Sequence, residues 1–272
     1  VRKHEVTTSS IMQTIPRILL NQPQTQADAD TPLRQVVALL PPDVHLEFER
    51  RFGVIAVPSY SLTEDLLSVI GSLEESRRKL GSCGAALAPN VHRIRICDEE
   101  GRACSPYELG EIVKQSPAMM IGYYKNTEAT TAALQDGWLH TGDLGYLDED
   151  GILYFVDRKK DMIKRSGENI ASAEVERVLN SHPLIAESAA VAVPDPIRQE
   201  EVKACIVLIP GTSRQMFPPE DIWAFCMEYL APFKVPRYLD IRSELPKTRS
   251  SKVQKNLLRE EGLGQGVVDR EA

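Results

Sequence analysis

The hairpin pattern at residues 144–157 is the feature that most constrains how this chain can fold. Residues 144–147 (LGYL) and 152–157 (ILYFVD) flank the turn DEDG, and this arrangement predicts two antiparallel strands. The basic residues Arg158–Lys160 follow, and beyond them strand and helix patterns alternate. We therefore predict an incomplete α/β part, residues 1–158, and a small α+β domain, residues 159–272.

Local patterns on both sides of the hairpin predict individual elements. A helix is expected to end at Gly53 and to be followed by a buried strand. Ser172 is expected to N-cap a helix whose Val175, Val178 and Leu179 share one face. Another amphipathic helix is predicted at 220–230. Five further strands are predicted at 92–101, 111–116, 188–194, 201–211 and 238–242.

Composition excludes several classes of protein. The 272 residues, of which 42% are hydrophobic and 26% charged, suit a globular chain with one or two cores. A net charge of −7 leaves no basic surplus for neutralising a nucleic acid. The five cysteines lie far apart without a CxxC pair, which predicts reduced thiols in a cytoplasmic protein. We find no apolar run long enough to span a membrane.

One turn near the hairpin carries polar groups suited to a ligand. Residues 141–143 (Thr-Gly-Asp) predict a tight turn at a strand start, and the Asp143 carboxylate could accept two hydrogen bonds from a ribose diol. Arg158, at the far end of the hairpin, could return to the same place. The plainer alternative, favoured on local grounds, is that Asp143 caps a turn and Arg158 pairs with a surface carboxylate.

Residues 137–170 as a whole resemble the signature of the adenylate-forming superfamily, which includes acyl-CoA synthetases, adenylation domains of peptide synthetases and beetle luciferases. Three more segments resemble that family in the same order, namely PSYSLTE (58–64), GEIVKQSPAMMIGYYKNTEAT (110–130) and PKTRSSKVQK (246–255). The resemblance is dense from about residue 50 to residue 258. Within the superfamily, DRKKDMIKRSGENI and FKVPRYLDIRSELP most resemble crotonobetaine/carnitine-CoA ligases.

This resemblance implies a fold and an activity. Residues 1–158 would be the C-terminal part of the large AMP-binding domain, and residues 159–272 its small, mobile C-terminal domain. The enzyme would be an ATP-dependent, AMP-forming acyl-CoA ligase of carnitine or fatty acid metabolism. Its cofactors would be ATP, Mg²⁺ and coenzyme A, and its other partner a small carboxylic acid, with no nucleic acid and no membrane span.

The resemblance also implies roles for residues of the large domain. Tyr60 would stack on adenine, while Asp143 and Arg158 would hold the ribose. Thr63 would donate a hydrogen bond to a phosphate, and Glu64 would be a catalytic residue that holds Mg²⁺. The residues alone leave two alternatives open, a half-buried strand tyrosine at Tyr60 and a helix N-terminus at Thr63-Glu64.

In the small domain, the resemblance makes Lys252 the catalytic lysine, whose ammonium would offset repulsion between a carboxylate and the α-phosphate. Lys160 would be the hinge between two domain poses. Gly167 and Glu168 would line the path of the CoA thiol. The alternatives are a solvated lysine in a basic tail and a plain turn before a helix.

Three serines depart from the family pattern, because Ser61, Ser166 and Ser251 occupy positions that are usually glycine. Each position could require a positive φ or a close backbone approach. Nothing in residues 1–57 resembles the family's glycine-rich phosphate loop, so we expect little ligase activity from these 272 residues alone.

Two alternatives to the ligase remain open. A peptide-synthetase adenylation domain would require a carrier domain after Lys252, for which residues 253–272 leave no room. A non-catalytic adenylate-binding or interaction module derived from a ligase would fit the three serines.

Overall fold

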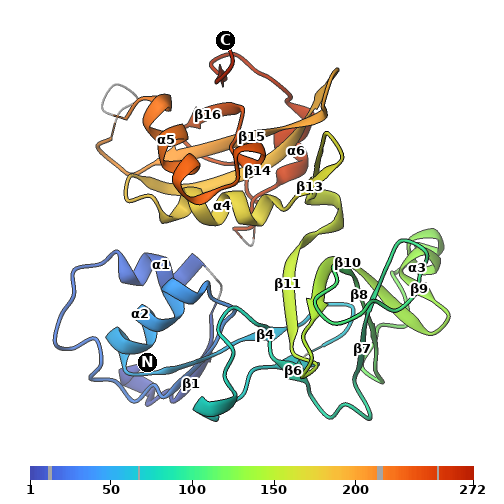
Figure 1. Ribbon diagram of the computed structural model, residues 1–272. Helices are drawn as coiled ribbons and strands as arrows, with labels where there is room; N and C mark the ends of the chain where they lie inside the picture. The colour runs from blue at the N-terminus through green and yellow to red at the C-terminus, as the bar shows by residue number, and fades with distance from the viewer. Residues whose placement is uncertain (12–13, 67, 213–216, 250) are drawn as a thin grey trace. The chain divides into compact units, whose positions relative to one another are not determined.

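The computed structural model describes residues 1–11, 14–66, 68–212, 217–249 and 251–272. It divides into two compact units, Val1–Phe155 and Val156–Ala272, drawn from blue through green and from yellow to red in Figure 1. The division falls inside strand β11 (Leu153–Arg158), a few residues before the boundary expected from the sequence. The predicted fold class, α/β followed by α+β, is confirmed.

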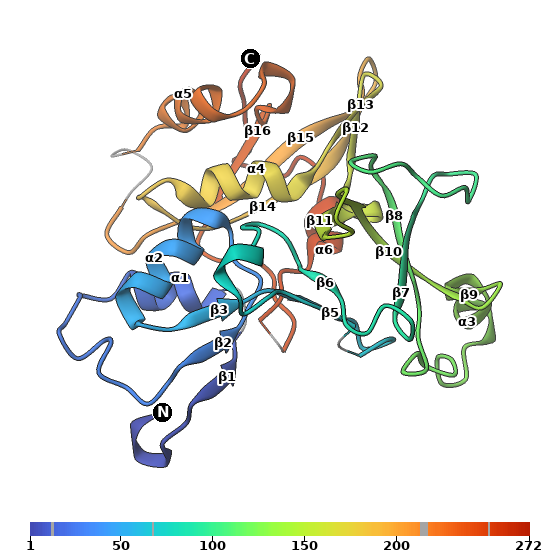
Figure 2. The ribbon, with the colours of Figure 1, turned by 60° about the horizontal axis from the view of Figure 1, so that its bottom comes forward.

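The first unit begins with a parallel sheet, which lies beside two helices (Figures 1 and 2). Val44 and Phe48 on one helix pack against Val36 and Ala56 on the strands. That helix ends at Gly53 as predicted, because the left-handed φ of 63° at this glycine stops the helix. The elements are η1 (Arg2–His4), β1 (Thr8–Ser10), α1 (Thr14–Leu20), β2 (Gln35–Val37), α2 (Pro42–Phe52) and β3 (Ile55–Val57).

Two antiparallel sheets complete the first unit. The smaller sheet has the order β4-β5-β6, and the larger has the order β11-β10-β8-β7 with β9 paired to β10. They share one core, which includes Tyr60, Val69, Ile96, Ile112 and Leu153. The predicted hairpin and the strands predicted at 92–101 and 111–116 are confirmed. The elements are β4 (Ser59–Tyr60), β5 (Val69–Ile70), η2 (Glu75–Arg77), β6 (Ala85–Ala86), β7 (Arg93–Cys97), β8 (Gly110–Gln115), α3 (Thr127–Ala133), β9 (Leu134–Gln135) and β10 (Trp138–Leu147).

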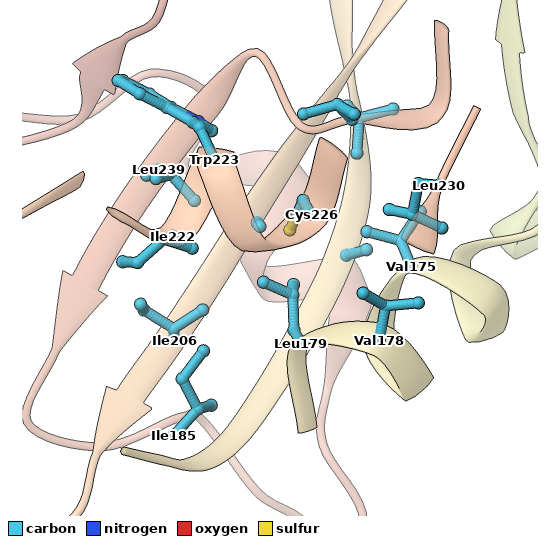
Figure 3. Close-up of a cluster of buried hydrophobic side chains, with 14 of the residues drawn as sticks. Val175, Val178, Leu179, Ile185, Ile206, Ile222, Trp223, Cys226, Leu230 and Leu239 are labelled. Carbon is cyan, nitrogen blue, oxygen red and sulfur yellow. The ribbon is translucent and has the colours of Figure 1, made fainter. Parts of the chain in front are cut away.

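The second unit packs its helices on a mixed sheet of order β13-β12-β15-β16-β17, to which β14 adds by pairing with β15. Figure 3 shows side chains from two helices gathering over the strands, namely Val175, Val178, Leu179, Ile222, Trp223 and Cys226 over Ile185, Ile206 and Leu239. The predicted helices and strands of this region are confirmed. The elements are η3 (Lys159–Asp161), β12 (Ile163–Arg165), β13 (Glu168–Ile170), α4 (Ser172–Ser181), β14 (Ile185–Asp195), β15 (Gln199–Leu208), α5 (Pro219–Tyr229), η4 (Pro232–Lys234), β16 (Tyr238–Arg242), α6 (Lys255–Glu260) and β17 (Val268–Asp269).

The N-cap predicted at Ser172 is wrong. Ser172 is the first residue of α4, and its hydroxyl donates to Asp157 Oδ2 at 2.8 Å. The same carboxylate oxygen accepts the Ala173 N–H at 3.2 Å. Asp157 thus accepts a backbone hydrogen bond at the start of α4 that an N-cap side chain would otherwise accept. Lys255 Nζ donates to the Ser172 hydroxyl at 2.7 Å and extends this network to the start of α6.

All five cysteines lie within the described residues, and each is a free thiol. Along the part of the chain that the structure describes, we find no helix with the length and apolarity that crossing a bilayer requires.

Candidate functional site

Strand β10 is irregular at residues 141–143. Its register with β8 shifts between His140 and Leu144, which identifies a β-bulge. Gly142 has a φ of 68°, a conformation that favours glycine. Residues 141–143 therefore lie within a strand, and the prediction of a turn at a strand start is wrong.

Two hydrogen bonds to β8 fix this bulge. The Thr141 hydroxyl donates to the Ile112 carbonyl oxygen at 2.6 Å. The Gly142 N–H donates to Glu111 Oε1 at 3.0 Å. Because both partners belong to a central strand of the sheet, the Asp143 backbone that follows is held in place by the core of the unit.

Tyr60 and Asp143, which are 83 residues apart in the sequence, are hydrogen-bonded to each other. The Tyr60 hydroxyl donates to Asp143 Oδ2 at 2.7 Å, and the two residues are only 6% and 2% exposed. Burial and the nearby Asp143 carboxylate raise the pKa of Tyr60 well above its ordinary value, so the phenol remains a donor. The structure thus brings together the two residues that the resemblance assigns to the adenine and the ribose.

Thr63 and Glu64 lie in the loop after β4. The described residues of this loop form no helix, so the alternative of a helix N-terminus is wrong. The Tyr123 hydroxyl donates to Glu64 Oε1 at 2.8 Å, and the Met120 N–H donates to the Glu64 carbonyl oxygen at 2.7 Å. Thr63 is exposed. Sequence reasoning missed Tyr123, which orients the candidate metal ligand.

The residue after Glu64 forms a buried ion pair that sequence reasoning also missed. Lys114 Nζ lies 2.9 Å from Asp65 Oδ2, and the two side chains are 1% and 0% exposed. The Ser116 hydroxyl donates to Asp65 Oδ1 at 2.6 Å. Burial lowers the pKa of Lys114, while Asp65 and Asp143 oppose this change. The signal was available, because Lys114 shares the inward face of β8 with Ile112.

The candidate residues of the second unit all lie at its surface. Arg158 ends β11 and Lys160 lies in η3. Gly167 lies in the turn after β12, and Glu168 begins β13. Lys252 lies in the loop between β16 and α6, where its N–H donates to Thr248 Oγ1 at 3.2 Å. Asp143 and Arg158 belong to different units, so a ribose site formed jointly by these two residues stays a prediction.

Two of the three serines at usual glycine positions adopt the conformation that glycine favours. Ser166 has a φ of 52° and Ser251 a φ of 62°. Ser61 is not among the residues with positive φ. The positive φ that the sequence suggested for these three positions is thus present at Ser166 and Ser251 and absent at Ser61.

Two family models match parts of this chain. Residues 1–124 match the AMP-binding enzyme family, and residues 174–252 match the AMP-binding enzyme C-terminal domain. The chain is 39% identical to the crotonobetaine/carnitine–CoA ligase of Salmonella typhi over 264 residues, which are 94% of this chain and 50% of that protein. It spans about half the length of the curated relatives that it matches.

Two solved structures of similar fold match this chain over most of its length. An o-succinylbenzoate CoA synthetase from Bacillus subtilis in complex with its acyl-adenylate intermediate matches with a TM-score of 0.82 and 36% identity, over 94% of this chain and 51% of that chain. ATP-bound MatB from Rhodopseudomonas palustris matches with a TM-score of 0.83 and 28% identity, over 94% of this chain and 50% of that chain.

Proposed function

Because this chain belongs to the AMP-binding enzyme family, we propose that it is the C-terminal part of an ATP-dependent, AMP-forming acyl-CoA ligase. Such an enzyme joins a carboxylate to the α-phosphate of ATP with release of pyrophosphate. It then transfers the acyl group to the thiol of coenzyme A with release of AMP. The observation that carries the proposal is the buried hydrogen bond between Tyr60 and Asp143, beside a loop bearing Thr63 and Glu64.

Tyr60 and Asp143 would hold the nucleoside. The Asp143 carboxylate can accept hydrogen bonds from the two ribose hydroxyls, and the Tyr60 hydroxyl already fixes the direction of one of its oxygens. Arg158 would add a donor to the same sugar. A carboxylate oriented in this way loses little freedom when the ribose binds, which favours affinity.

Thr63 and Glu64 would hold the phosphates. The Glu64 carboxylate suits Mg²⁺, which in proteins commonly takes one or two carboxylates together with substrate phosphates. In the described part of the chain no three His, Cys, Asp or Glu side chains converge as a metal cluster, so Glu64 would act with the phosphates themselves. Bound Mg²⁺ would neutralise phosphate charge. The Tyr123 hydroxyl, 2.8 Å from Glu64 Oε1, would keep the carboxylate oriented.

Residues of the second unit would serve the transfer steps. The exposed Lys252 ammonium would reduce repulsion between the substrate carboxylate and the α-phosphate. Gly167 and Glu168 would line the path of the CoA thiol, and Lys160 would act as the hinge between the two steps. The carnitine and crotonobetaine named by the relatives are the first acids to test, within carnitine or fatty acid metabolism in the cytoplasm.

A chimeric enzyme tests this proposal. The N-terminal half of the Salmonella typhi relative, joined to this chain, should release AMP when it is given ATP, Mg²⁺, coenzyme A and crotonobetaine or carnitine. Lys252→Ala should lower this rate about 100-fold or more, because transition-state charge loses its cation. The exposed Lys164, changed to alanine, is the matched control and should retain the rate.

The same assay separates the alternatives. This chain alone is expected to release little AMP, and strong CoA-dependent AMP release by the 272 residues would contradict that expectation. A folded chimera that binds ATP but forms no adenylate would instead favour the non-catalytic module.

A further inference from the structure

The ion pair between Lys114 and Asp65 has no part in the chemistry described so far. We infer that Lys114 is a positioning residue: through Asp65, it fixes the loop that carries Thr63 and Glu64. This inference rests on the proposed function, because only that function places the loop at the phosphates. Lys114 lies on β8, and Asp65 is the next residue after Glu64.

Stability alone does not account for this pair. Both side chains are removed from water, and removing two charges from water costs solvation free energy that their mutual attraction does not reliably recover. Two apolar residues of similar volume would fill the same space without that cost. What an ion pair supplies, and an apolar pair does not, is a directional contact of defined geometry.

Lys114 holds both the side chain and the backbone of Asp65. Its Nζ lies 2.9 Å from Asp65 Oδ2 and 3.3 Å from the Asp65 carbonyl oxygen. The Ser116 hydroxyl takes the other carboxylate oxygen at 2.6 Å. Asp65 is thus held at three points, two from Lys114 on β8 and one from Ser116, the residue after this strand, and β8 is a central strand of its sheet.

The loop transmits this attachment to the residues that would bind phosphate and metal. Leu62 and Asp65 exchange backbone hydrogen bonds of 3.2 and 3.3 Å, which close the turn around Thr63 and Glu64. The Met120 N–H donates to the Glu64 carbonyl oxygen at 2.7 Å. A displacement of Asp65 therefore moves Glu64, and errors of about 1 Å in such a group can cost about 100-fold in rate.

The same Lys114 ammonium lies near Tyr60, which would bind the nucleoside together with Asp143. Lys114 Nζ is 5.2 Å from the centre of the Tyr60 ring, within the range of a cation–π interaction. One buried cation thus contacts both the loop that would hold phosphate and the tyrosine that would hold the base. Its loss is expected to affect the loop more strongly, because the loop depends on its direct contacts.

Hydrogen exchange of this chain tests the positioning without any ligand. The variant Asp65→Asn/Lys114→Met removes both charges together, so neither is left buried alone. The amides of Leu62, Asp65 and Met120 should exchange about tenfold faster than in the wild-type chain, since the turn loses its attachment. The exchange rate of the Ala38 amide, which follows β2 and donates to the Val57 carbonyl oxygen, should not change. Unchanged exchange in the loop, with the variant folded, would overturn the inference.

Calorimetric titration with adenosine and with AMP adds the functional readout. The double variant should lose about tenfold in affinity for AMP with Mg²⁺, whereas its affinity for adenosine should change by less than about twofold. The exposed Lys3, changed to methionine, is the control that should leave both affinities unchanged. Equal loss for adenosine and AMP would indicate a merely structural pair and overturn the inference. A wild-type chain that binds neither ligand would overturn the proposed function, while the exchange measurement would still decide the positioning.

Discussion

Ser166 and Ser251 adopt left-handed backbone conformations although both carry a β-carbon. The left-handed region costs an L-residue about 1–2 kcal/mol relative to the ordinary helical region. Both serines lie in exposed loops, one next to Gly167 and one next to Lys252. The strain therefore falls in the two loops that the proposed function assigns to thiol transfer and to adenylation.

Replacing either serine by glycine should stabilise the second unit. Ser166→Gly and Ser251→Gly each relieve the strain but add chain entropy to the unfolded state, so the net gain should be about 0.5–1 kcal/mol. Urea unfolding followed by Trp223 fluorescence, in a Trp138→Phe background, measures this gain, because the two tryptophans of the chain lie in different units.

Ser61 is the matched control for these substitutions. It occupies a third usual glycine position without a positive φ, so Ser61→Gly relieves no strain and should lower stability by about 0.5–1 kcal/mol. This variant is measured through Trp138 in a Trp223→Phe background. If Ser61→Gly were stabilising to the same degree as the other two, backbone strain would not be the cause.

His45 should make the stability of the first unit depend on pH. Its ring is buried, with Nε2 3.2 Å from Glu49 Oε1 and 3.0 Å from Arg78. Burial lowers the pKa of His45 below its ordinary value of 6.5, and Glu49 only partly opposes this. The unfolded chain therefore binds a proton at higher pH than the folded chain does. The stability that depends on a neutral His45 is fully present above about pH 6.5 and is lost as the pH falls through the pKa of His45 in the folded state.

Urea unfolding at pH 7.5 and at pH 5.5, followed by Trp138 in a Trp223→Phe background, measures this dependence. The free energy of unfolding of the first unit should fall toward pH 5.5, and the fall should be smaller in His45→Gln. Equal falls in the two proteins would show that His45 does not titrate between these pH values as argued.

At the scale of elements, strand β10 contains two glycines with different requirements, Gly142 in the bulge and Gly145 in the regular pairing after it. A β-carbon on Gly142 would meet no atom within 4 Å, so only its φ of 68° opposes substitution. A β-carbon on Gly145 would lie 2.4 Å from the Tyr154 carbonyl oxygen on the neighbouring strand. Gly142 is thus required by conformation and Gly145 by space.

These requirements predict different costs for alanine. Gly142→Ala should lower the unfolding free energy of the first unit by about 1–2 kcal/mol. Gly145→Ala should cost more, because β11 must move away from β10 and their hydrogen bonds weaken. Trp138 fluorescence during urea unfolding measures both. A smaller cost at Gly145 than at Gly142 would mean that the strands separate easily at this point.

The start of α4 supplies a second prediction at this scale. Asp157→Ala should lower the unfolding free energy of the second unit by about 1–2 kcal/mol, since the Ala173 N–H and the Ser172 hydroxyl lose their acceptor. Ser172→Ala should cost less, because the carboxylate still accepts the Ala173 N–H. Urea unfolding followed by Trp223 in a Trp138→Phe background compares them, and the opposite order would restore Ser172 as the cap.

For the whole molecule, the sequence predicts the elements better than the contacts between them. The hairpin, the helix stop at Gly53 and the apolar face of α4 depend on neighbouring residues, so local patterns reveal them. The Tyr60–Asp143 hydrogen bond spans 83 residues; the resemblance put both residues at one nucleotide, but the bond between them comes from the structure. The alternation of β8 puts Lys114 on the inward face of the strand, but no local rule identifies Asp65 as its partner, so only the structure reveals the pair.

We propose that this chain retains the adenylate-binding half of an acyl-CoA ligase. Loss of the Asp143 carboxylate should remove the acceptor of the ribose hydroxyls and weaken binding about tenfold or more, because hydrogen bonds to a charged group are worth about 1.5–3 kcal/mol. Asp150, exposed in the turn between β10 and β11, provides a carboxylate of the same unit as the control.

Calorimetric titration of the chain with a non-hydrolysable acyl-adenylate analogue tests this claim most directly. We expect saturable binding by the wild-type chain, unchanged binding by Asp150→Ala and a loss of about tenfold or more in Asp143→Ala. A folded wild-type chain that does not bind the analogue, or an Asp143→Ala variant that binds it equally well, would contradict the proposed adenylate site.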